Sequence, residues 1–202
     1  DCVLYAKWKE RAEWESCGNM RFSAASAVSI NMALSRDGTP YVVYVDGGNN
    51  NKATVMKYNG VYWENVGSPG FSTGTIGSPA IALNSDGLPC VVYIDYSGDS
   101  KAIVKKFNGF EWETVGGVWL STGQVSSTDI TIASDGSIHV VYHDNVIGKA
   151  VVKTFNGTLW VGVGNENGEV SNGDFTTPRI TTDFFGVPYV VIISGTPGKS
   201  AI

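Results

Sequence analysis

The chain has few of the groups on which catalysis or metal binding usually depends. Its 202 residues include 2 histidines, 3 cysteines and 3 methionines, and only 16% are charged. The net charge of -5, with lysines spread along the chain, excludes the basic surface that holds a phosphate backbone, so we expect no nucleic-acid partner. No apolar run approaches the roughly 20 residues that cross a bilayer, so we expect no membrane insertion.

Three cysteines cannot all pair within one chain. Cys17 and Cys90 stand where Val66 and Tyr41 stand in a repeat described below, which favours buried free thiols. A disulfide between Cys2 and Cys17 is the alternative, and it would indicate an oxidising compartment. No charged and apolar signal segment opens the sequence, so the location has to be inferred from composition. Abundant Gly, Ser, Thr and Asn with low charge are typical of an exported protein. We therefore expect a secreted or cell-surface location.

One segment of sixteen residues is written three times with small changes. The copies are KATVMKYNGVYWENVG (52–67), KAIVKKFNGFEWETVG (101–116) and KAVVKTFNGTLWVGVG (149–164). The Asp-Gly pairs that begin at Asp37, Asp86 and Asp135 repeat with a spacing of 49 residues, and Gly186 continues the series. A period of this length is typical of stacked supersecondary units.

Each unit contains four runs with strand character. In the second unit they are SPAIALN, CVVYIDY, KAIVKKF and FEWETVG, with an Asn-Gly turn between the last two. Runs such as YVVYV do not alternate between apolar and polar residues, so both faces of each sheet should be covered. The sequence predicts an all-β fold, a β-propeller of four-stranded antiparallel blades with about 49 residues per repeat and almost no helix. The repeated segments are then the outer two strands of each blade, and their aromatic residues pack between blades.

The two ends of the chain complement each other. Residues 1–18 match the third and fourth strands of a blade, and residues 177–202 match the first and second. We expect one domain over 1–202, with blades at 29–67, 78–116 and 127–164, and a fourth made from 177–202 plus 1–18. Such closure would remove the open sheet edges. The final residues KSAI resemble the start of a third strand, so the alternatives are a piece of a longer array, or a homodimer in which two chains share a ring.

The pattern DG-x-P-x-VVY-x-D followed by KA-x-V-x-K-[YF]-NG-x-x-W resembles the blades of tandem-repeat β-propellers from exported bacterial proteins. More distantly, it is similar to kelch, Asp-box and tachylectin-type propellers. The resemblance covers essentially the whole chain and implies its architecture. Kelch blades carry a Gly-Gly pair that occurs here once, at Gly47-Gly48. The Asp-box-like turn at Asp37-Gly38 lies between first and second strands, whereas sialidase-like blades carry it between third and fourth, which argues against sialidase activity.

In such a ring the first strand of each blade lines the axis. Equivalent positions of the four first strands hold Asn31, Ala80, Asp129 and Arg179. Buried charge is costly unless it is paired. Asp129 and Arg179 are therefore expected to form either a salt bridge that plugs a narrow channel, which we favour, or the polar floor of a binding site.

A second set of polar residues lies in the loops that join a fourth strand to the next first strand. Each loop places a serine beside an apolar residue, as at Ser72, Ser121 and Ser171, and Trp119 offers a stacking surface. Hydroxyls on one face would suit a neutral polyhydroxy ligand such as a sugar. The alternative is that these serines bond within their own turns.

The loops after the second strands hold Asp46, Asp95 and Asp144, each followed five or six residues later by a lysine. We expect these carboxylates to accept turn amides and to form exposed ion pairs of small effect.

The two histidines, His139 and His143, fall about 13 Å apart along one predicted strand and cannot share a metal ion. Local burial is the default for both histidines. His143 beside Asp144 is a candidate for acid–base chemistry near the loop face, which is the face where the loops after the fourth strands and after the second strands gather. No glycine-rich phosphate loop, paired-cysteine zinc motif or nucleophile elbow occurs. We therefore expect no metal site and no cofactor.

These features favour a non-catalytic binding module that recognises a carbohydrate or a protein surface with its loop face. Repeating a weak site raises effective affinity, whereas catalysis requires one asymmetric constellation. One alternative is a glycoside hydrolase-like (sialidase-like) enzyme that uses Asp129, Asp144 or Asp174. The other is a structural repeat fragment without a small ligand. The candidate ligand-binding residues are Asn31, Asp129, Arg179, Ser72, Ser121, Ser171, Trp119 and His143.

Overall fold

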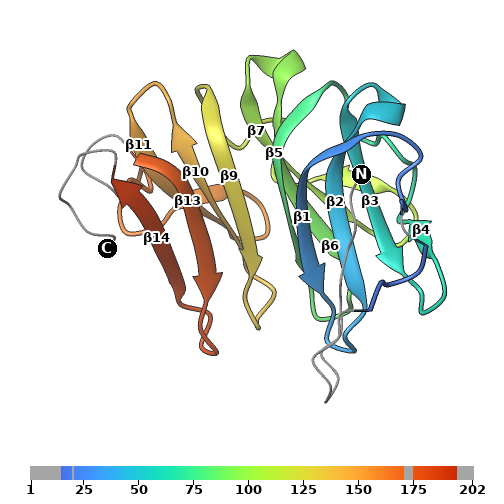
Figure 1. Cartoon of the computed structure of the whole chain (residues 1–202). Helices are drawn as coiled ribbons and strands as arrows, with labels where there is room; N and C mark the ends of the chain where they lie inside the picture. Colours follow the sequence, from blue (N-terminus) through green and yellow to red (C-terminus); the bar gives the residue numbers. More distant parts are fainter. Residues whose placement is uncertain (1–14, 20, 171–174, 195–202) are drawn as a thin grey trace.

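A computed structural model describes residues 15–19, 21–170 and 175–194 of the chain (Figure 1). Over these residues the regular structure is β-strand, apart from two short 3₁₀ turns, η1 at Gly47–Asn49 and η2 at Tyr96–Gly98. No helix in the described part of the chain is long and apolar enough to span a membrane.

The described strands form four antiparallel sheets, which we call blades 1 to 4, and neighbours in sequence are neighbours in each sheet. Blade 1 contains β1 (Ala27–Leu34), β2 (Pro40–Asp46), β3 (Lys52–Tyr58) and β4 (Trp63–Asn65). Blade 2 contains β5 (Ile76–Leu83), β6 (Pro89–Asp95), β7 (Lys101–Phe107) and β8 (Trp112–Thr114). Blade 3 contains β9 (Val125–Ile132), β10 (Ile138–Asp144), β11 (Lys149–Phe155) and β12 (Trp160–Gly162), and blade 4 contains β13 (Phe175–Thr182) and β14 (Pro188–Ser194).

The turn between the third and fourth strands is longer than the two-residue Asn-Gly hairpin expected from the sequence. In blade 1, Tyr58 pairs with Trp63, which leaves four residues in the loop. The Asn59 side-chain oxygen accepts the backbone amides of Val61 and Tyr62, both at 3.0 Å. Gly60 has a φ of +97°, a conformation that glycine adopts without steric cost. Asparagine therefore organises a wider turn, because its side chain satisfies two loop amides.

Successive blades bury their apolar faces against each other. All seven residues of β6 are buried, which explains why its sequence shows no apolar–polar alternation. On the side facing blade 1, Tyr93 and Ile81 belong to the same apolar cluster as Val43 and Val55. On the opposite side, Val92 packs with residues of blade 3. The two largest apolar clusters thus lie between blades, and a smaller one lies on the other face of blade 1, where Cys17 and Phe22 pack.

A tryptophan on each fourth strand ties its blade to the one before. The indole Nε1 of Trp112 donates to the Val66 carbonyl at 3.0 Å, and that of Trp160 donates to the Val115 carbonyl at 3.0 Å. The residue after Val115 is glycine because the Trp160 ring lies against it: a Cβ on Gly116 would lie 2.5 Å from the indole nitrogen. These contacts agree with the expectation that the repeated aromatic residues pack between blades.

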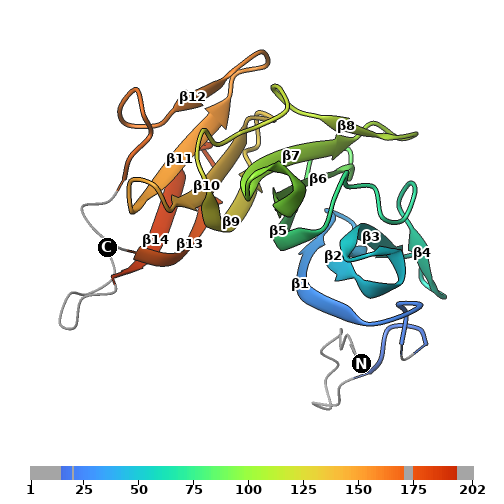
Figure 2. The same ribbon diagram turned by 90° about the horizontal axis from the view of Figure 1, so that it is seen from above.

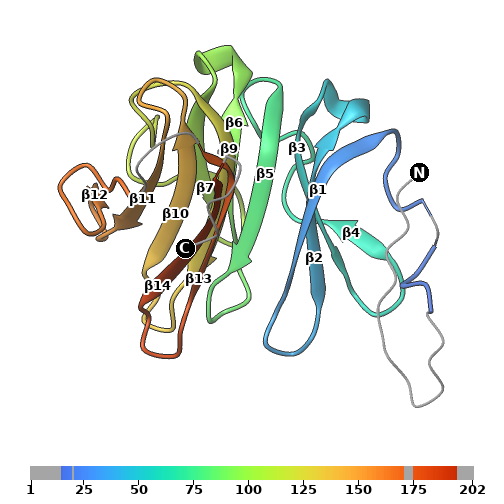
Figure 3. The same cartoon turned by 60° about the vertical axis from the view of Figure 1, so that its left-hand side comes forward.

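The blades follow an arc in the view from above, with the first strands on its inner side and β4, β8 and β12 on its outer side (Figure 2). β1 packs against β5, β5 against β9, and β9 against β13. The β13–β14 hairpin lies beside β9 and β10 at one end of the arc, and β1 lies at the other (Figure 3).

The expected closure of a four-blade ring is not seen in the described residues, where no sheet joins the two ends of the arc. Residues 1–14, which were expected to supply a third and a fourth strand, lie outside the described part, as does Cys2. Closure by the chain ends, the number of blades in a complete ring and the Cys2–Cys17 disulfide therefore stay predictions. Cys90 is buried, as expected.

Replacing Trp112 by phenylalanine should lower the free energy of unfolding by about 1 to 3 kcal/mol, because it removes the indole donor and leaves the Val66 carbonyl unpaired. For a chain of this size the melting temperature should fall by about 2 to 4 °C per kcal/mol. The matched control is Trp119→Phe, since Trp119 is 38% exposed. Equal melting temperatures for the two variants in scanning calorimetry would contradict the role of the interblade hydrogen bond.

Candidate functional site

Polar residues of the first strands join one blade to the next. The Asn31 side-chain oxygen accepts the amide of Ile81 at 3.3 Å, and Asp129 Oδ2 accepts the amide of Ile180 at 2.9 Å. The equivalent position in blade 2 is Ala80, which has no polar group to offer. These side chains hold neighbouring first strands together along the inner side of the arc.

Blades 2 and 3 are joined by a different pair. The Thr128 amide donates to Ser78 Oγ at 3.2 Å, and Thr128 Oγ1 donates to the Ser78 carbonyl at 2.5 Å. Ser78 has a φ of +45° and lies in a bulge of β5. The bulge allows this serine to bond with the neighbouring blade where Ala80 cannot.

Asp129 and Arg179 form the ion pair that was expected as a plug. Arg179 Nη1 lies 3.7 Å from Asp129 Oδ1, with the arginine side chain 59% exposed and the aspartate 13% exposed. Burial raises the pKa of Asp129 above its usual range, although the Ile180 amide and the Arg179 guanidinium oppose this effect. The carboxylate thus serves mainly as a hydrogen-bond acceptor between blades. Ligand binding by Asn31, Asp129 and Arg179 stays a prediction.

The loop serines are buried and hydrogen-bonded within the fold. Ser72 Oγ accepts the Ala53 amide at 3.0 Å and donates to the Gly74 carbonyl at 2.7 Å. Ser121 Oγ makes the same two contacts, with the Ala102 amide and the Gly123 carbonyl. Both side chains are 3% exposed, which matches the turn-stabilising alternative. Ser171 lies outside the described residues, and sugar binding by any of the three stays a prediction.

Trp119 presents a partly exposed ring on the loop face. It lies over Gly98, where a Cβ would approach the ring to 1.7 Å, and Lys101 Nζ lies 5.7 Å from the ring centroid. Because residue 98 is glycine, the indole ring of Trp119 can lie directly against its backbone. An exposed ring with an adjacent cation remains a candidate stacking surface for a ligand.

His143 does not pair with Asp144. Its Nδ1 lies 2.9 Å from Ser126 Oγ and 3.1 Å from Asn145 Oδ1. Asp144 is buried, and its Oδ1 accepts the amides of Val146 and Ile147 at 2.9 and 3.4 Å. The Asp144 carboxylate thus shapes its loop, and acid–base chemistry or ligand binding by His143 stays a prediction.

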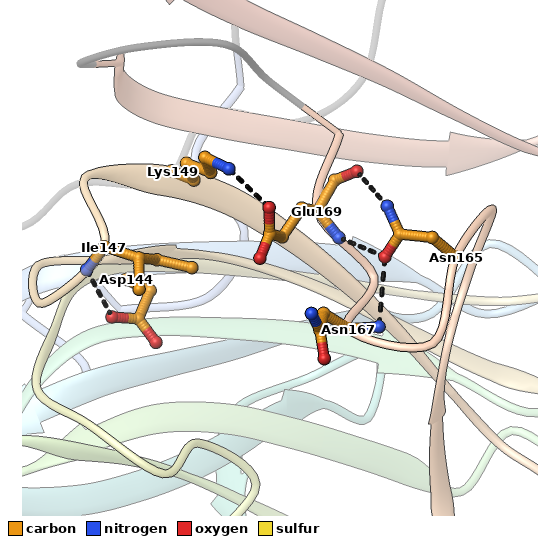
Figure 4. Close-up of polar contacts among 6 residues, drawn as sticks. All are labelled: Asp144, Ile147, Lys149, Asn165, Asn167 and Glu169. Carbon is orange, nitrogen blue, oxygen red and sulfur yellow. Dashed lines mark hydrogen bonds and ion pairs between the residues drawn. The ribbon is translucent and has the colours of Figure 1, made fainter.

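The aspartates after the second strands accept turn amides, as expected. Asp46 Oδ1 accepts the Gly48 amide at 2.9 Å, and Asp95 Oδ1 accepts the Ser97 amide at 2.8 Å. The exposed ion pairs expected with the lysines that follow are not found among the described residues: all three aspartates are buried, and the ion partner of Lys149 is Glu169 (Figure 4).

Glu169 is held by Asn165, whose side chain donates to the Glu169 carbonyl at 3.1 Å and accepts its amide at 3.2 Å. Figure 4 shows this turn beside Lys149, apart from the Asp144 loop. The loop after β12 thus gives blade 3 an ion pair, between Lys149 and Glu169, that the repeat pattern does not predict.

The described residues contain a hollow on the face opposite the predicted loop face. It has a volume of about 430 Å³ and lies between blades 2 and 3, where the Asp-Gly and Asn-Gly turns meet. Phe107 and Phe155 supply apolar walls, and Cys90 lies at its buried side. Burial raises the pKa of the Cys90 thiol to about 12, so it stays protonated at neutral pH. The polar lining includes Asn84, Lys106, Asp135, Ser137 and Asn156.

A hollow of about 400 Å³ lies at the equivalent place on blade 1, and all of its described lining residues come from blade 1. Its lining includes Asp37, Thr39, Tyr58 and Asn59, which correspond in sequence to Asp135, Ser137, Phe155 and Asn156. Sequence reasoning missed both hollows. The available signal was Lys57 and Lys106 recurring just before the Asn-Gly turn.

The described residues contain no group of three His, Cys, Asp or Glu side chains that could hold a metal ion.

No protein-family model matches this chain, and no curated protein sequence does. Among solved structures, the Aleuria aurantia lectin, described as a fungal lectin with a six-bladed β-propeller fold and a novel fucose recognition mode, has a TM-score of 0.59 at 11% identity. AofleA from Arthrobotrys oligospora has a TM-score of 0.54 at 10% identity. A candidate glycoside hydrolase from Bacteroides ovatus has a TM-score of 0.50 at 14% identity.

These matches cover 96%, 85% and 75% of this chain, and 67%, 50% and 53% of the respective proteins. The chain thus spans about half to two thirds of the length of the structures it resembles. At these identities the likeness shows the fold alone: an all-β architecture of four-stranded antiparallel sheets like that of β-propeller lectins.

Replacing Asp129 by asparagine should change the free energy of unfolding at pH 7 by less than about 1 kcal/mol, because an amide oxygen still accepts the Ile180 amide. Asp129→Ala should cost about 1 to 3 kcal/mol, since the amide loses its acceptor. Urea unfolding of the two variants measures the difference. If asparagine were as destabilising as alanine, the ion pair with Arg179 would be the dominant contact instead.

Stability should fall as the pH decreases from about 7.5 to 5.5, with His139 responsible for part of the loss. Burial lowers the pKa of His139 below its usual value of about 6.5. Below that value the unfolded chain binds a proton more readily than the folded chain does, so the free energy of unfolding declines until the pH passes the folded-state pKa. His139→Gln should reduce this decline in urea unfolding curves. An unchanged pH dependence would contradict the assignment.

Proposed function

We propose that this protein is a non-catalytic carbohydrate-binding β-propeller whose sugar sites are the hollows between successive blades. The observation that carries the proposal is the hollow between blades 2 and 3, whose volume of about 430 Å³ lies in the range typical of small-molecule sites. It presents phenylalanine side chains beside one cation, one carboxylate and two amides.

That combination suits a sugar, which offers apolar C–H faces and hydroxyl groups that both donate and accept. Lys106 can donate to hydroxyl oxygens, and Asp135 can accept from hydroxyl protons. The side-chain NH2 groups of Asn84 and Asn156 can also donate, while their oxygens each accept two turn amides. The walls provide the apolar complement through Phe107 and Phe155. A neutral ligand is favoured because the hollow contains one group of each charge.

The structural neighbours support a carbohydrate as the class of ligand. A variant of the Aleuria aurantia lectin that resembles this chain, with a TM-score of 0.58, was solved with α-methyl-L-fucoside. That sugar is therefore the first ligand to test. A glycan-binding role agrees with the secreted or cell-surface location expected from the composition. The exposed Trp119 ring on the loop face is the second place at which a glycan or a protein surface could bind.

A glycoside hydrolase has less support from the arrangement of its candidate acids. Asp144 is 5% exposed and accepts two loop amides, and Asp129 bonds to the next blade. Asp174 lies outside the described residues. Neither of the two described carboxylates is free to approach a glycosidic bond in this arrangement.

Glycan-array screening followed by calorimetric titration with α-methyl-L-fucoside and other monosaccharides tests the proposal. Lys106→Met and Asp135→Asn should each weaken binding about tenfold, equivalent to about 1.4 kcal/mol, because each removes a charge-assisted hydrogen bond. Lys52→Met is the matched control, since Lys52 begins β3 at the opposite end of its blade. Assays for released reducing ends should show no turnover.

Full affinity in both hollow variants, with a loss only in Trp119→Ala, would move the site to the loop face. Absence of binding to any glycan on the array would overturn the proposal.

A further inference from the structure

The first strand of blade 1 exposes the apolar face that other first strands bury. Met32 is 43% exposed and Leu34 is 60% exposed. Met32 pairs with Val42 in the register in which Ile81 pairs with Val91 and Ile130 with Val140. Ile81 and Ile130 are each only 5% exposed, because the preceding blade covers them. Nothing among the described residues covers Met32 in the same way.

The opposite end of the arc exposes the matching face. Tyr189, Val191 and Ile193 on β14 are 58%, 47% and 58% exposed. Their counterparts on β6 are Cys90, Val92 and Ile94, which are no more than 2% exposed because they pack in the apolar cluster shared with blade 3. The two ends of the chain thus carry the two halves of one interblade contact.

The contacts on blade 1 also show which strands of a preceding blade the described residues do not supply. Trp63 Nε1 donates to the Cys17 carbonyl at 2.9 Å, as Trp112 donates to Val66 and Trp160 to Val115. Residues 15–18 therefore lie against blade 1 in the way that the end of a preceding blade's fourth strand lies against the blade that follows it. The first-strand and second-strand positions beside them are not filled by the described residues. Those two strands are the ones that blade 4 provides, as β13 and β14.

A hydrogen-bonding group is also in place for such a contact. Thr177 on β13 occupies the bulge position of Ser78 and has the same left-handed backbone, with φ of +48° against +45°. Ser78 Oγ accepts the Thr128 amide of the next blade. The Thr177 hydroxyl can accept the amide of Ile30, which occupies the position of Thr128 on β1.

We propose that the β13–β14 hairpin of a second copy of this chain docks on β1, so that copies join head to tail. The hairpin of the same copy lies at the far end of the arc (Figure 2). The junction would also complete the half-open hollow of blade 1. Asp37, Thr39 and Tyr58 line its existing wall, and Pro188 and Tyr189 of the second copy would add the wall that Pro89 and Cys90 supply between blades 2 and 3. No other described residue supplies that second wall.

The assembly does not rest on sugar binding, so its test is the mass in solution. Light scattering over a dilution series should give at least twice the 21.5 kDa of one chain at the higher concentrations. Met32→Asp and Val191→Asp should each reduce the mass to one chain, because each places a charge in one half of the junction. A mixture of the two variants should form a 1:1 pair of two chains. The Met32→Asp copy keeps its β14 face and the Val191→Asp copy keeps its β1 face.

Val61→Asp is the matched control, because Val61 is 74% exposed in the turn before β4 and belongs to neither face. It should keep the mass of the unmodified chain, and circular dichroism confirms that each variant is folded. A mass of one chain at every concentration would overturn the proposal, as closure within one chain would produce. Failure of the two variants to pair, when the unmodified chain assembles, would overturn it equally.

Discussion

The interaction on which the rest of the structure depends is the burial of each sheet on both of its faces. The middle of β6 has no polar side, since Val91 and Tyr93 pack toward blade 1 while Val92 and Ile94 pack toward blade 3. A four-stranded sheet of this kind cannot form a core by itself, so its stability comes from its neighbours. This constraint also explains why apolar side chains are exposed at the two ends of the arc, each of which has only one neighbouring blade among the described residues.

Polar contacts between blades are few and are placed at the edges of the apolar cores. The tryptophan hydrogen bonds tie the outer strands of one blade to the blade before, and Asn31, Ser78 and Asp129 tie the first strands on the inner side of the arc. The tryptophan recurs in each blade, whereas the first-strand residues differ, but each of these side chains gives a backbone amide or carbonyl its partner. The polar side chains on the inner side of the arc therefore serve the packing of blades. The hollows lie elsewhere, between the turns of adjacent blades, where two walls face each other without a strand between them.

Much of the fold and part of the candidate site could be predicted from the sequence. The strand positions follow from hairpin signals and apolar runs, which act over a few residues, and the ion pair of Asp129 with Arg179 follows from equivalent positions in the repeat. The roles of Ser72 and Ser121 could not be decided in this way. Their hydroxyls bond to amides 19 residues earlier in the chain, and only the folded loops bring those groups together. Lys149 likewise forms its ion pair with Glu169, rather than with Asp144, because the loop after β12 folds back onto β11.

The sequence by itself determined the sheets, the turns that connect them and the apolar faces that stack them, because these depend on local backbone preference and on the order of side chains along a strand. Only the tertiary structure decided where a hollow of small-molecule size forms. The hollow beside Lys106 and Asp135 is made by residues from two blades that are distant in the chain, and its shape depends on the angle between those blades. The same is true of the exposed ends: Met32 and Val191 look like ordinary core residues in the sequence, and only the arc formed by the described residues shows that these residues leave them uncovered.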